Sequence, residues 1–169
     1  MNLKELNHPN RLWVGDITYI SIQEIGFGYL AAPMDRFSRK LVGWKLGVDM
    51  TEQIVIDSLR MAIRNRQPEP GMIHHSDRGG QYASKAYRKI INRANIKQSM
   101  SRAADCYDNA FLESCFGTIK TELEMTEYKN YSEALKDIKD YISYYNFDRK
   151  HSALNYQTPS QFEQNFYLN

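Results

Sequence analysis

The order of its segments limits the fold of this 169-residue chain more than any other sequence feature. Three segments rich in β-branched and aromatic residues come first: Leu12–Ile20, Gly28–Pro33 and Lys40–Val48. Turn-prone residues separate them, which predicts an antiparallel three-strand meander. The expected elements that follow are, in order, a helix between Thr51 and Pro68, a strand at Gly71–His75, a helix at Ser84–Asn95, a strand at Ile96–Ser99 and two more helices. This order predicts an α/β fold in which helices flank a five-stranded mixed sheet.

Capping residues mark where the last two helices begin. Asp108 or Asn109 is a candidate N-cap for the third helix, and Asn130 with Glu133 makes a possible capping box for the fourth. The expected apolar faces are Leu112, Cys115, Ile119 and Leu123 in the third helix, and Leu135, Ile138, Ile142 and Tyr145 in the fourth.

Composition excludes several classes of protein. The chain is 42% hydrophobic and 25% charged, as in ordinary globular domains. No stretch approaches the roughly 18 to 20 apolar residues that a membrane span needs, and Met1–Asn10 lacks the apolar segment of a signal peptide. Cys106 and Cys115 form no CxxC pair, so packing is favoured over a zinc site or disulfide. We therefore expect a cytoplasmic protein with no membrane partner.

The net charge of +2 hides an uneven distribution. Residues 1–110 hold 16 Lys and Arg against 11 Asp and Glu, whereas residues 111–169 hold 6 against 9. From Arg78 to Arg102 there are seven basic residues and no acidic one. A solvated helix face would explain this run, and so would a surface that contacts nucleic-acid phosphates. The candidate phosphate contacts are Arg78, Lys85, Arg88, Lys89 and Arg93, with Tyr82 among them.

Three carboxylates are candidates for one site. Asp16 lies inside an apolar strand, Asp77 follows a strand and opens a loop with two glycines, and Glu113 lies one turn into a predicted helix. Sixty residues separate the first two and 35 the second and third. Each has an ordinary explanation: a solvent-facing strand acid, an Asp-Gly turn and a first-turn helix acid. Together they can converge at one edge of the sheet.

Converging carboxylates repel one another, so such a cluster requires cations. Hard oxygen ligands without a thiolate or imidazole set favour Mg²⁺ or Mn²⁺. Two such ions can activate an attacking oxygen and stabilise a leaving oxygen at phosphorus. Lys120, seven residues after Glu113, shares its helix face and could hold a DNA phosphate or simply face solvent. His75 and Ser76 could orient the metal site from behind its ligands, whereas His74 is expected to be a core histidine.

Five sequence segments carry a family resemblance: RLWVGDITYI, MDRFSRKLVGW, IHHSDRGGQYAS, QSMSRAADCYDNAFLESCFGTIKTE and YISYYNFDRKHSALNYQTPSQF. The chain resembles the integrase catalytic core of OrfB-type transposases of the insertion-sequence-three family, relatives of retroviral integrases, from about Leu12 to Phe162. The resemblance implies a ribonuclease-H-like fold, with Asp16, Asp77 and Glu113 as the DDE metal ligands and Lys120 as the basic residue that follows. It also implies Mg²⁺ as cofactor, replaceable by Mn²⁺ and bound as two ions.

The implied activity is DNA strand cleavage and strand transfer, on transposon ends and target DNA, by a homo-oligomer. The implied division is a polar extension (1–11), the integrase core (12–128) and a C-terminal helix and tail packed on the core (129–169). No helix-turn-helix region fits before Leu12 and no zinc module is present, so we expect a fragment or a truncated reading frame with weak, non-specific DNA binding. Two alternatives remain: a ribonuclease-H-like nuclease without strand transfer, and a DNA-binding remnant inactive in transposition.

Overall fold

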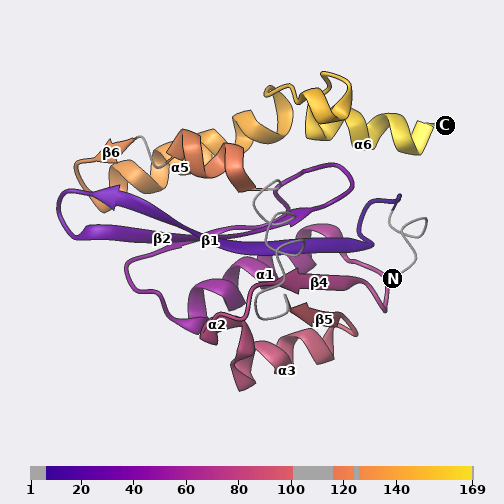
Figure 1. Ribbon diagram of the computed structural model, residues 1–169, viewed down its shortest axis with the longest axis horizontal. Helices are drawn as coiled ribbons and strands as arrows, with labels where there is room; N and C mark the ends of the chain where they lie inside the picture. Colours follow the sequence, from indigo (N-terminus) through magenta and orange to yellow (C-terminus); the bar gives the residue numbers. More distant parts are fainter. Residues whose placement is uncertain (1–6, 101–115, 124–125, 169) are drawn as a thin grey trace.

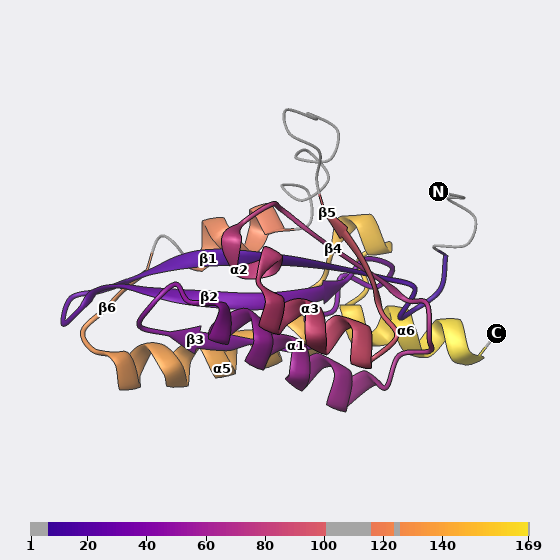
Figure 2. The ribbon, with the colours of Figure 1, turned by 90° about the horizontal axis from the view of Figure 1, so that it is seen from below.

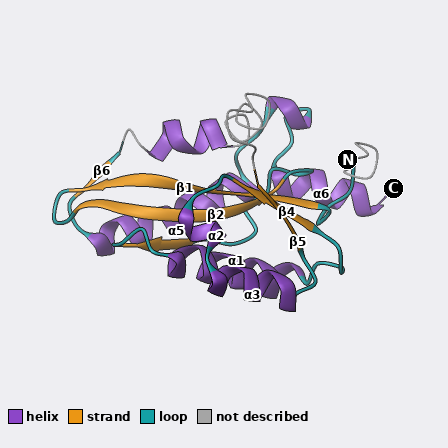
Figure 3. Ribbon diagram, turned by 60° about the horizontal axis from the view of Figure 1, so that its bottom comes forward, coloured by secondary structure: helices purple, strands orange, loops and turns teal. Residues whose placement is uncertain are grey.

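The computed structural model describes residues 7–100, 116–123 and 126–168. A sheet forms the middle layer of the fold, as Figures 1 and 3 show. The helices α1 (Glu52–Arg66), α2 (Gly80–Ala83) and α3 (Lys85–Arg93) lie on one side of it. The helix of residues 116–123, α5 (Tyr131–Phe147) and α6 (Pro159–Leu168) lie on the other. A short 3-10 helix, η2 (Ser152–Leu154), joins the last two.

The sheet is mixed, as predicted, but it has six strands rather than five. They are β1 (Leu12–Ile22), β2 (Gly26–Asp35), β3 (Lys45–Gly47), β4 (Ile73–Ser76), β5 (Lys97–Met100) and β6 (Glu127–Tyr128). The order is β3-β2-β1-β4-β5, with β6 paired to the far end of β1. The first three strands form the expected antiparallel meander, and β4, β5 and β6 run parallel to their neighbours.

The third expected strand, Lys40–Val48, is mostly wrong, since only Lys45–Gly47 is a strand. The main chain of Leu41 bonds instead to the Asn146 carboxamide, whose Oδ1 accepts at 2.9 Å and whose Nδ2 donates at 3.0 Å. A Cβ on Gly43 would lie 2.4 Å from the Ser58 carbonyl oxygen, so α1 packs directly on this backbone. Leu41 still forms an isolated antiparallel bridge with Met34 of β2, so the pairing is broken between Leu41 and Lys45, where α1 packs on Gly43.

The helices largely confirm the sequence pattern. α1 ends at Gln67, whose φ of 44° is left-handed and which is followed by Pro68. Thr51 caps α1 without a side-chain hydrogen bond, whereas the Ser84 hydroxyl accepts the Tyr87 N–H at the start of α3. The short α2, between β4 and α3, was not predicted.

The predicted capping residues of α5 both act as caps. Oδ1 of Asn130 accepts the Glu133 N–H at 2.9 Å, while the Glu133 carboxylate accepts the Lys129 N–H at 2.8 Å. Ile138, Ile142 and Tyr145 are buried as expected, but Leu135 is 39% exposed and Ala134 is buried in its place. The predicted apolar face was therefore wrong by one residue at its N-terminal end.

The sheet separates two apolar cores. Val14, Ile20 and Ile22 of β1 pack on the residue 116–123 helix and α5. Trp13, on the other face of β1, packs with α1 and α3, which lie side by side across this face in Figure 2. The ends of the described helix, Phe116 and Leu123, are both buried, and its predicted face residue Ile119 is too. Leu112 and both cysteines lie outside the described residues.

A buried ion cluster holds α6 against the meander and α1. Arg66 donates to both carboxylate oxygens of Glu163 at 2.8 and 2.7 Å, and Ser38 donates to the same carboxylate at 2.7 Å. Asp35 lies 3.9 Å from the Arg66 guanidinium and is fully buried. Within the described ranges, no helix is both long and apolar enough to cross a membrane.

Candidate active site

The register of two parallel strands brings Asp16 and Asp77 together. Gly15 of β1 and Ser76 of β4 are paired at the end of β4. Asp16 follows Gly15 in β1, and Asp77 follows Ser76 at the end of β4. The two residues are therefore neighbours where β4 ends and β1 continues. The register thus places the backbones of Asp16 and Asp77 next to one another. That the carboxylates form one site stays a prediction.

Asp16 is a partly buried carboxylate with two different partners. Its Oδ1 accepts the Ile17 N–H at 2.8 Å, and its Oδ2 lies 2.7 Å from Nζ of Lys120. The Asp16 side chain is 16% exposed and that of Lys120 is 37% exposed. Lys120 therefore pairs with the Asp16 carboxylate. The DNA-phosphate contact expected of Lys120 stays a prediction.

Asp77 is exposed and begins the turn that leads into α2. Its Oδ1 accepts the Gly79 N–H at 2.9 Å, and the Ser76 hydroxyl donates to its carbonyl oxygen at 2.9 Å. A Cβ on Gly79 would lie 3.0 Å from this Oδ1, which favours glycine at the turn. Within the described residues no side chain hydrogen-bonds the second oxygen, Oδ2.

The third expected carboxylate, Glu113, lies outside the described residues. Among the residues that are described, no group of three or more His, Cys, Asp and Glu side chains is arranged to hold a metal ion. The described part of the candidate site is therefore the pair Asp16 and Asp77, with Lys120 beside the first.

A cluster of buried rings packs against β1 at Gly15, the residue before Asp16. The Tyr87 hydroxyl lies 3.3 Å from Nδ1 of His74, and the Tyr82 ring packs edge-on against Tyr87 at 5.4 Å. Burial lowers the pKa of His74 to about 3, with a further contribution from His75, so His74 is a neutral core histidine as predicted. A Cβ on Gly15 would lie 2.7 Å from the His74 ring, which shows how closely this cluster approaches β1.

Tyr82 belongs to this cluster rather than to a DNA path. Its side chain is 3% exposed, so the DNA contact expected of it is contradicted by its burial. Burial raises the pKa of its hydroxyl well above the usual value, and the nearby charges of Tyr87, Asp16 and Asp77 raise it further. The ring thus lies within electrostatic reach of both carboxylates.

His75 and Ser76 are the last two residues of β4 and directly precede Asp77 in the sequence. Nδ1 of His75 is 3.0 Å from the Ser99 hydroxyl of β5, and His75 and Ser99 are register partners. Ser76 is fully buried. The orienting role expected of His75 and Ser76 stays a prediction.

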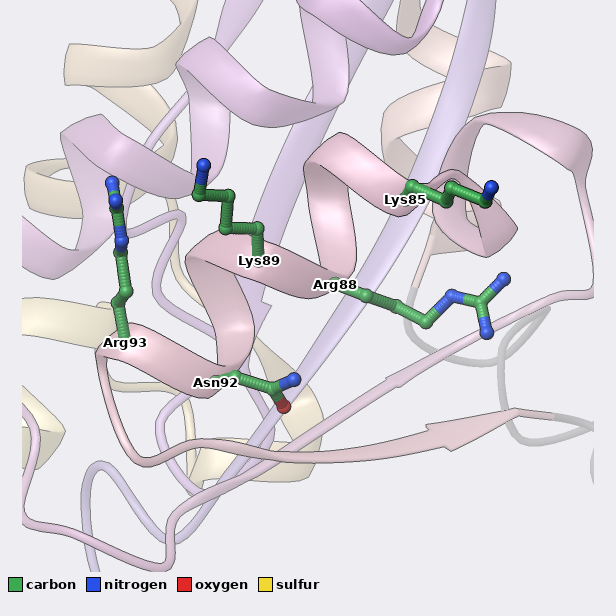
Figure 4. A pocket seen from close by; sticks show the side chains of 5 residues that line it. All are labelled: Lys85, Arg88, Lys89, Asn92 and Arg93. Atoms are coloured by element: carbon green, nitrogen blue, oxygen red, sulfur yellow. The ribbon is translucent and has the colours of Figure 1, made fainter.

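The basic side chains of α3 form an exposed stripe. The stripe has two rows of residues spaced four apart, which lie along one side of the helix: Lys85, Lys89 and Arg93 in the first, and Arg88 and Asn92 in the second. All five project from the helix in Figure 4 and line a shallow surface hollow of about 510 Å³. The Arg88 guanidinium turns back to the Ala83 carbonyl oxygen at 2.5 Å. Among the described residues, no acidic side chain pairs with this stripe.

Two contributors were missed by the sequence reasoning. Asn92 lines the hollow, and its position four residues after Arg88 could have indicated it. Arg149 contacts the helix that carries Lys120, through Glu122. The spacing of Arg149 and Glu122 held no signal for this contact, because the residues lie on separate elements.

The fold is that of integrase and transposase catalytic cores. The catalytic core domain of HTLV-2 integrase in complex with magnesium superposes with a TM-score of 0.68 at 18% identity, over 92% of this chain and 97% of that one. The catalytic domain of the Mos1 mariner transposase gives a TM-score of 0.62 at 15% identity, over 94% and 76%. The expected ribonuclease-H-like fold class is thereby confirmed.

The chain belongs to the integrase core domain family, which matches residues 7–106, and a second integrase core domain description matches residues 94–159. The transposase of IS904 from Lactococcus lactis is 42% identical over 157 residues, covering 92% of this chain and 62% of the relative. The transposase InsF of IS3A from Escherichia coli is 41% identical over 157 residues, covering 92% and 54%. The resemblance to insertion-sequence-three transposases is confirmed, and this chain spans little more than half the length of these relatives.

Proposed function

We propose that this chain is the catalytic core of a DNA transposase that cleaves a DNA strand and joins the freed 3′-hydroxyl to another phosphodiester. The observation that carries the proposal is the adjacency of Asp16 and Asp77, set by the pairing of Gly15 with Ser76. Membership of the integrase core domain family and the two transposase relatives support the same activity.

The donor set of the site fits a divalent cation. Each carboxylate uses Oδ1 to accept a backbone N–H, which fixes its orientation. Oδ2 of Asp16 already accommodates a cationic group, the Lys120 ammonium at 2.7 Å, and Oδ2 of Asp77 has no partner among the described residues. Hard carboxylate oxygens of this kind suit Mg²⁺ and Mn²⁺.

Asp16 and Asp77 would hold the metal, and Glu113 is the third ligand that we propose. Two bound Mg²⁺ ions, or Mn²⁺ in their place, would polarise the scissile phosphodiester and lower the pKa of the attacking water or 3′-hydroxyl. Lys120, beside Asp16, would contribute a positive charge next to the reacting phosphate. The neighbouring solved structure with magnesium, the HTLV-2 integrase core, supports the choice of ion.

DNA would reach this site along the basic side of the molecule. The α3 stripe begins just after the Asp77 turn and α2 in the chain. We propose that Lys85, Arg88, Lys89 and Arg93 contact the phosphate backbone of transposon-end or target DNA, with exposed Arg78 in the Asp77 loop. The bacterial source of the transposase relatives supports our further proposal that the reaction takes place in the cytoplasm.

We further propose that the active form is a homo-oligomer on DNA. A simian T-cell lymphotropic virus intasome and the dimeric and trimeric forms of the HTLV-2 integrase core are among the structures with this fold. A strand-transfer reaction joins two DNA segments, and several protomers can hold these segments together.

Incubation of the protein with labelled transposon-end DNA and a target plasmid in Mg²⁺ or Mn²⁺ tests the proposal. We expect cleaved and joined products from the wild type and neither from Asp77→Asn, because asparagine keeps the size of the side chain but removes its charge. Asp140→Asn, at an exposed position on α5, is the matched control. Cleavage without joining would identify a nuclease, and DNA binding without either product a remnant; both outcomes contradict the proposal.

A further inference from the structure

Glu122 connects the helix of residues 116–123 to the chain that follows α5. Its Oε1 accepts from Nη2 of Arg149 at 2.7 Å and from Nε at 2.9 Å. Its Oε2 accepts from the Tyr141 hydroxyl of α5 at 2.7 Å. Charge-assisted, two-pronged bonds of this kind fix direction as well as distance.

We propose that Arg149 and Tyr141 are positioning residues of the active site: they hold the residue 116–123 helix through Glu122 and so keep Lys120 at Asp16. The proposal rests on the function proposed above, because the active site is defined by that function. It also assigns a role to the segment after α5. The proposed roles of the carboxylates and of the basic stripe do not involve this segment.

The helix itself shows why Glu122 could control Lys120. Successive residues are turned by about 100° around a helix. The buried side chains Phe116, Ile119 and Leu123 therefore form one stripe, with Lys120 on one side of it and Glu122 on the other. Apolar contacts hold the stripe against the core, but they are non-directional and resist rotation about the helix axis poorly. Hydrogen bonds to Glu122 oppose the rotation that would withdraw Lys120.

The other end of the clamp is firmly anchored. The Arg149 N–H donates to the Tyr144 carbonyl oxygen at 2.9 Å, which fixes its backbone to the last turn of α5. The following His151 is buried, packs edge-on against Tyr145 at 4.8 Å and donates its N–H to the Gln157 carbonyl oxygen at 3.1 Å. Arg149 is thus presented from a rigid support rather than from a free tail.

The charges of the clamp are consistent with this role. Burial opposes ionisation of Glu122, but hydrogen bonds from Arg149 and Tyr141 outweigh it and lower the pKa of the carboxyl group. The side chains of Arg149 and Glu122 are 22% and 34% exposed, so solvent weakens their attraction only in part. A simpler explanation is that the pair only anchors the tail after α5, and the experiment must separate the two.

Chemical labelling of Lys120 separates them without relying on catalysis. An amine-reactive acetylating reagent, with site-by-site quantification by mass spectrometry, reports how freely each lysine side chain is available. In the wild type, the 2.7 Å pair with Asp16 should protect Lys120 relative to the exposed Lys136 and Lys139 of α5. We expect Arg149→Ala to raise Lys120 labelling severalfold, and Tyr141→Phe to raise it less.

Lys150→Ala is the matched control, because it removes the adjacent positive charge from an exposed side chain. It should leave Lys120 labelling unchanged. Unchanged labelling of Lys120 in a folded Arg149→Ala protein would overturn the proposal. If Arg149→Ala unfolds, Tyr141→Phe decides, because it deletes one hydroxyl and keeps the ring: no increase in that variant also overturns the proposal.

A double-mutant cycle then links the clamp to the reaction. Arg149→Ala, Lys120→Ala and the double variant are compared in strand joining. If Arg149 acts through Lys120, the double variant should be no worse than Lys120→Ala, within about twofold. A double variant whose loss of strand joining equals the product of the two single losses would overturn the proposal. A wild type without any DNA products would count against the proposed function alone, since the labelling result still decides whether the clamp positions Lys120.

Discussion

The ammonium of Lys120 lies 2.7 Å from Oδ2 of Asp16, so that a side chain from a helix and a side chain from the middle of a strand form one ion pair. A divalent cation bound to the same oxygen would compete with this ammonium. In the proposed site, Lys120 would therefore affect metal binding as well as contact DNA.

Removal of the Lys120 charge should strengthen metal binding in the absence of DNA. We expect Lys120→Met to bind Mn²⁺ about two- to fivefold more tightly in calorimetry, as for the loss of a competing, partly exposed ion pair. The same variant should bind DNA more weakly. Weaker Mn²⁺ binding would show instead that Lys120 supports the metal ligands.

The approach of His74 to β1 makes Gly15 sensitive to substitution. A Cβ there would lie 2.7 Å from Cε1 of His74 and 3.3 Å from the Tyr82 ring, both in the buried cluster. Gly15→Ala should lower the free energy of unfolding by about 1 to 3 kcal/mol, measured by urea denaturation. Gly80→Ala is the control: nothing lies within 4 Å of its added Cβ, so it should be neutral or slightly stabilising. Equal changes in the unfolding free energy of the two variants would mean that the buried rings shift at little cost to make room for the Cβ.

Asp35 should give a pH dependence of stability opposite to that of a carboxylate whose pKa is lowered on folding. Burial raises the pKa of Asp35 to about 6 from 3.8; Glu163 adds to the rise, while the Asn10 amide and Arg66 oppose it. The folded state therefore holds a proton that the unfolded state releases between these pH values, and the contribution of Asp35 to stability falls as pH rises through this window.

Asp35→Asn should remove this effect. Its unfolding free energy relative to the wild type should rise between pH 4.5 and 6, by at most about 1.4 kcal/mol per pH unit. Glu163, whose pKa is lowered by its bonds to Arg66 and Ser38 despite burial, loses its stabilising contribution only as the pH falls below this window. Urea denaturation at a series of pH values provides the measurement, with Asp140→Asn as control. A difference that is independent of pH would mean that Asp35 has an ordinary pKa.

The α3 stripe should account for part of the salt dependence of DNA binding. Replacing Arg88, Lys89 and Arg93 by Ala should reduce the slope of log K against log salt concentration by up to about 2.7. Fluorescence anisotropy with a labelled duplex is a suitable measurement. The control replaces exposed Lys129, Lys136 and Lys139, at or on α5 on the other side of the sheet. An equal change of this slope in both triple variants would mean that α3 is an ordinary solvated helix with no special contact to DNA.

The order of the elements and the antiparallel meander were predictable, because alternation and turn residues are local properties. The pairing of Lys120 with Asp16 was not, since it depends on how a helix is placed on the sheet. Spacing along that helix predicted only which face Lys120 occupies.

Two expectations differ from the structure. Tyr82 was expected to contact DNA together with the basic residues around it, but its ring is buried against Tyr87. The strand expected over Lys40–Val48 is broken between Leu41, which forms an isolated bridge with Met34, and Lys45. In this gap α1 packs on Gly43, a contact that the local pattern does not show.

The central claim is that Asp16 and Asp77 bind the same divalent ions. Anomalous diffraction from a crystal soaked in Mn²⁺ tests this most directly. We predict a metal peak in coordination contact with Oδ2 of both carboxylates, with Lys120 displaced from Asp16. Well-ordered carboxylates that share no metal peak at saturating Mn²⁺ would contradict the proposed enzyme.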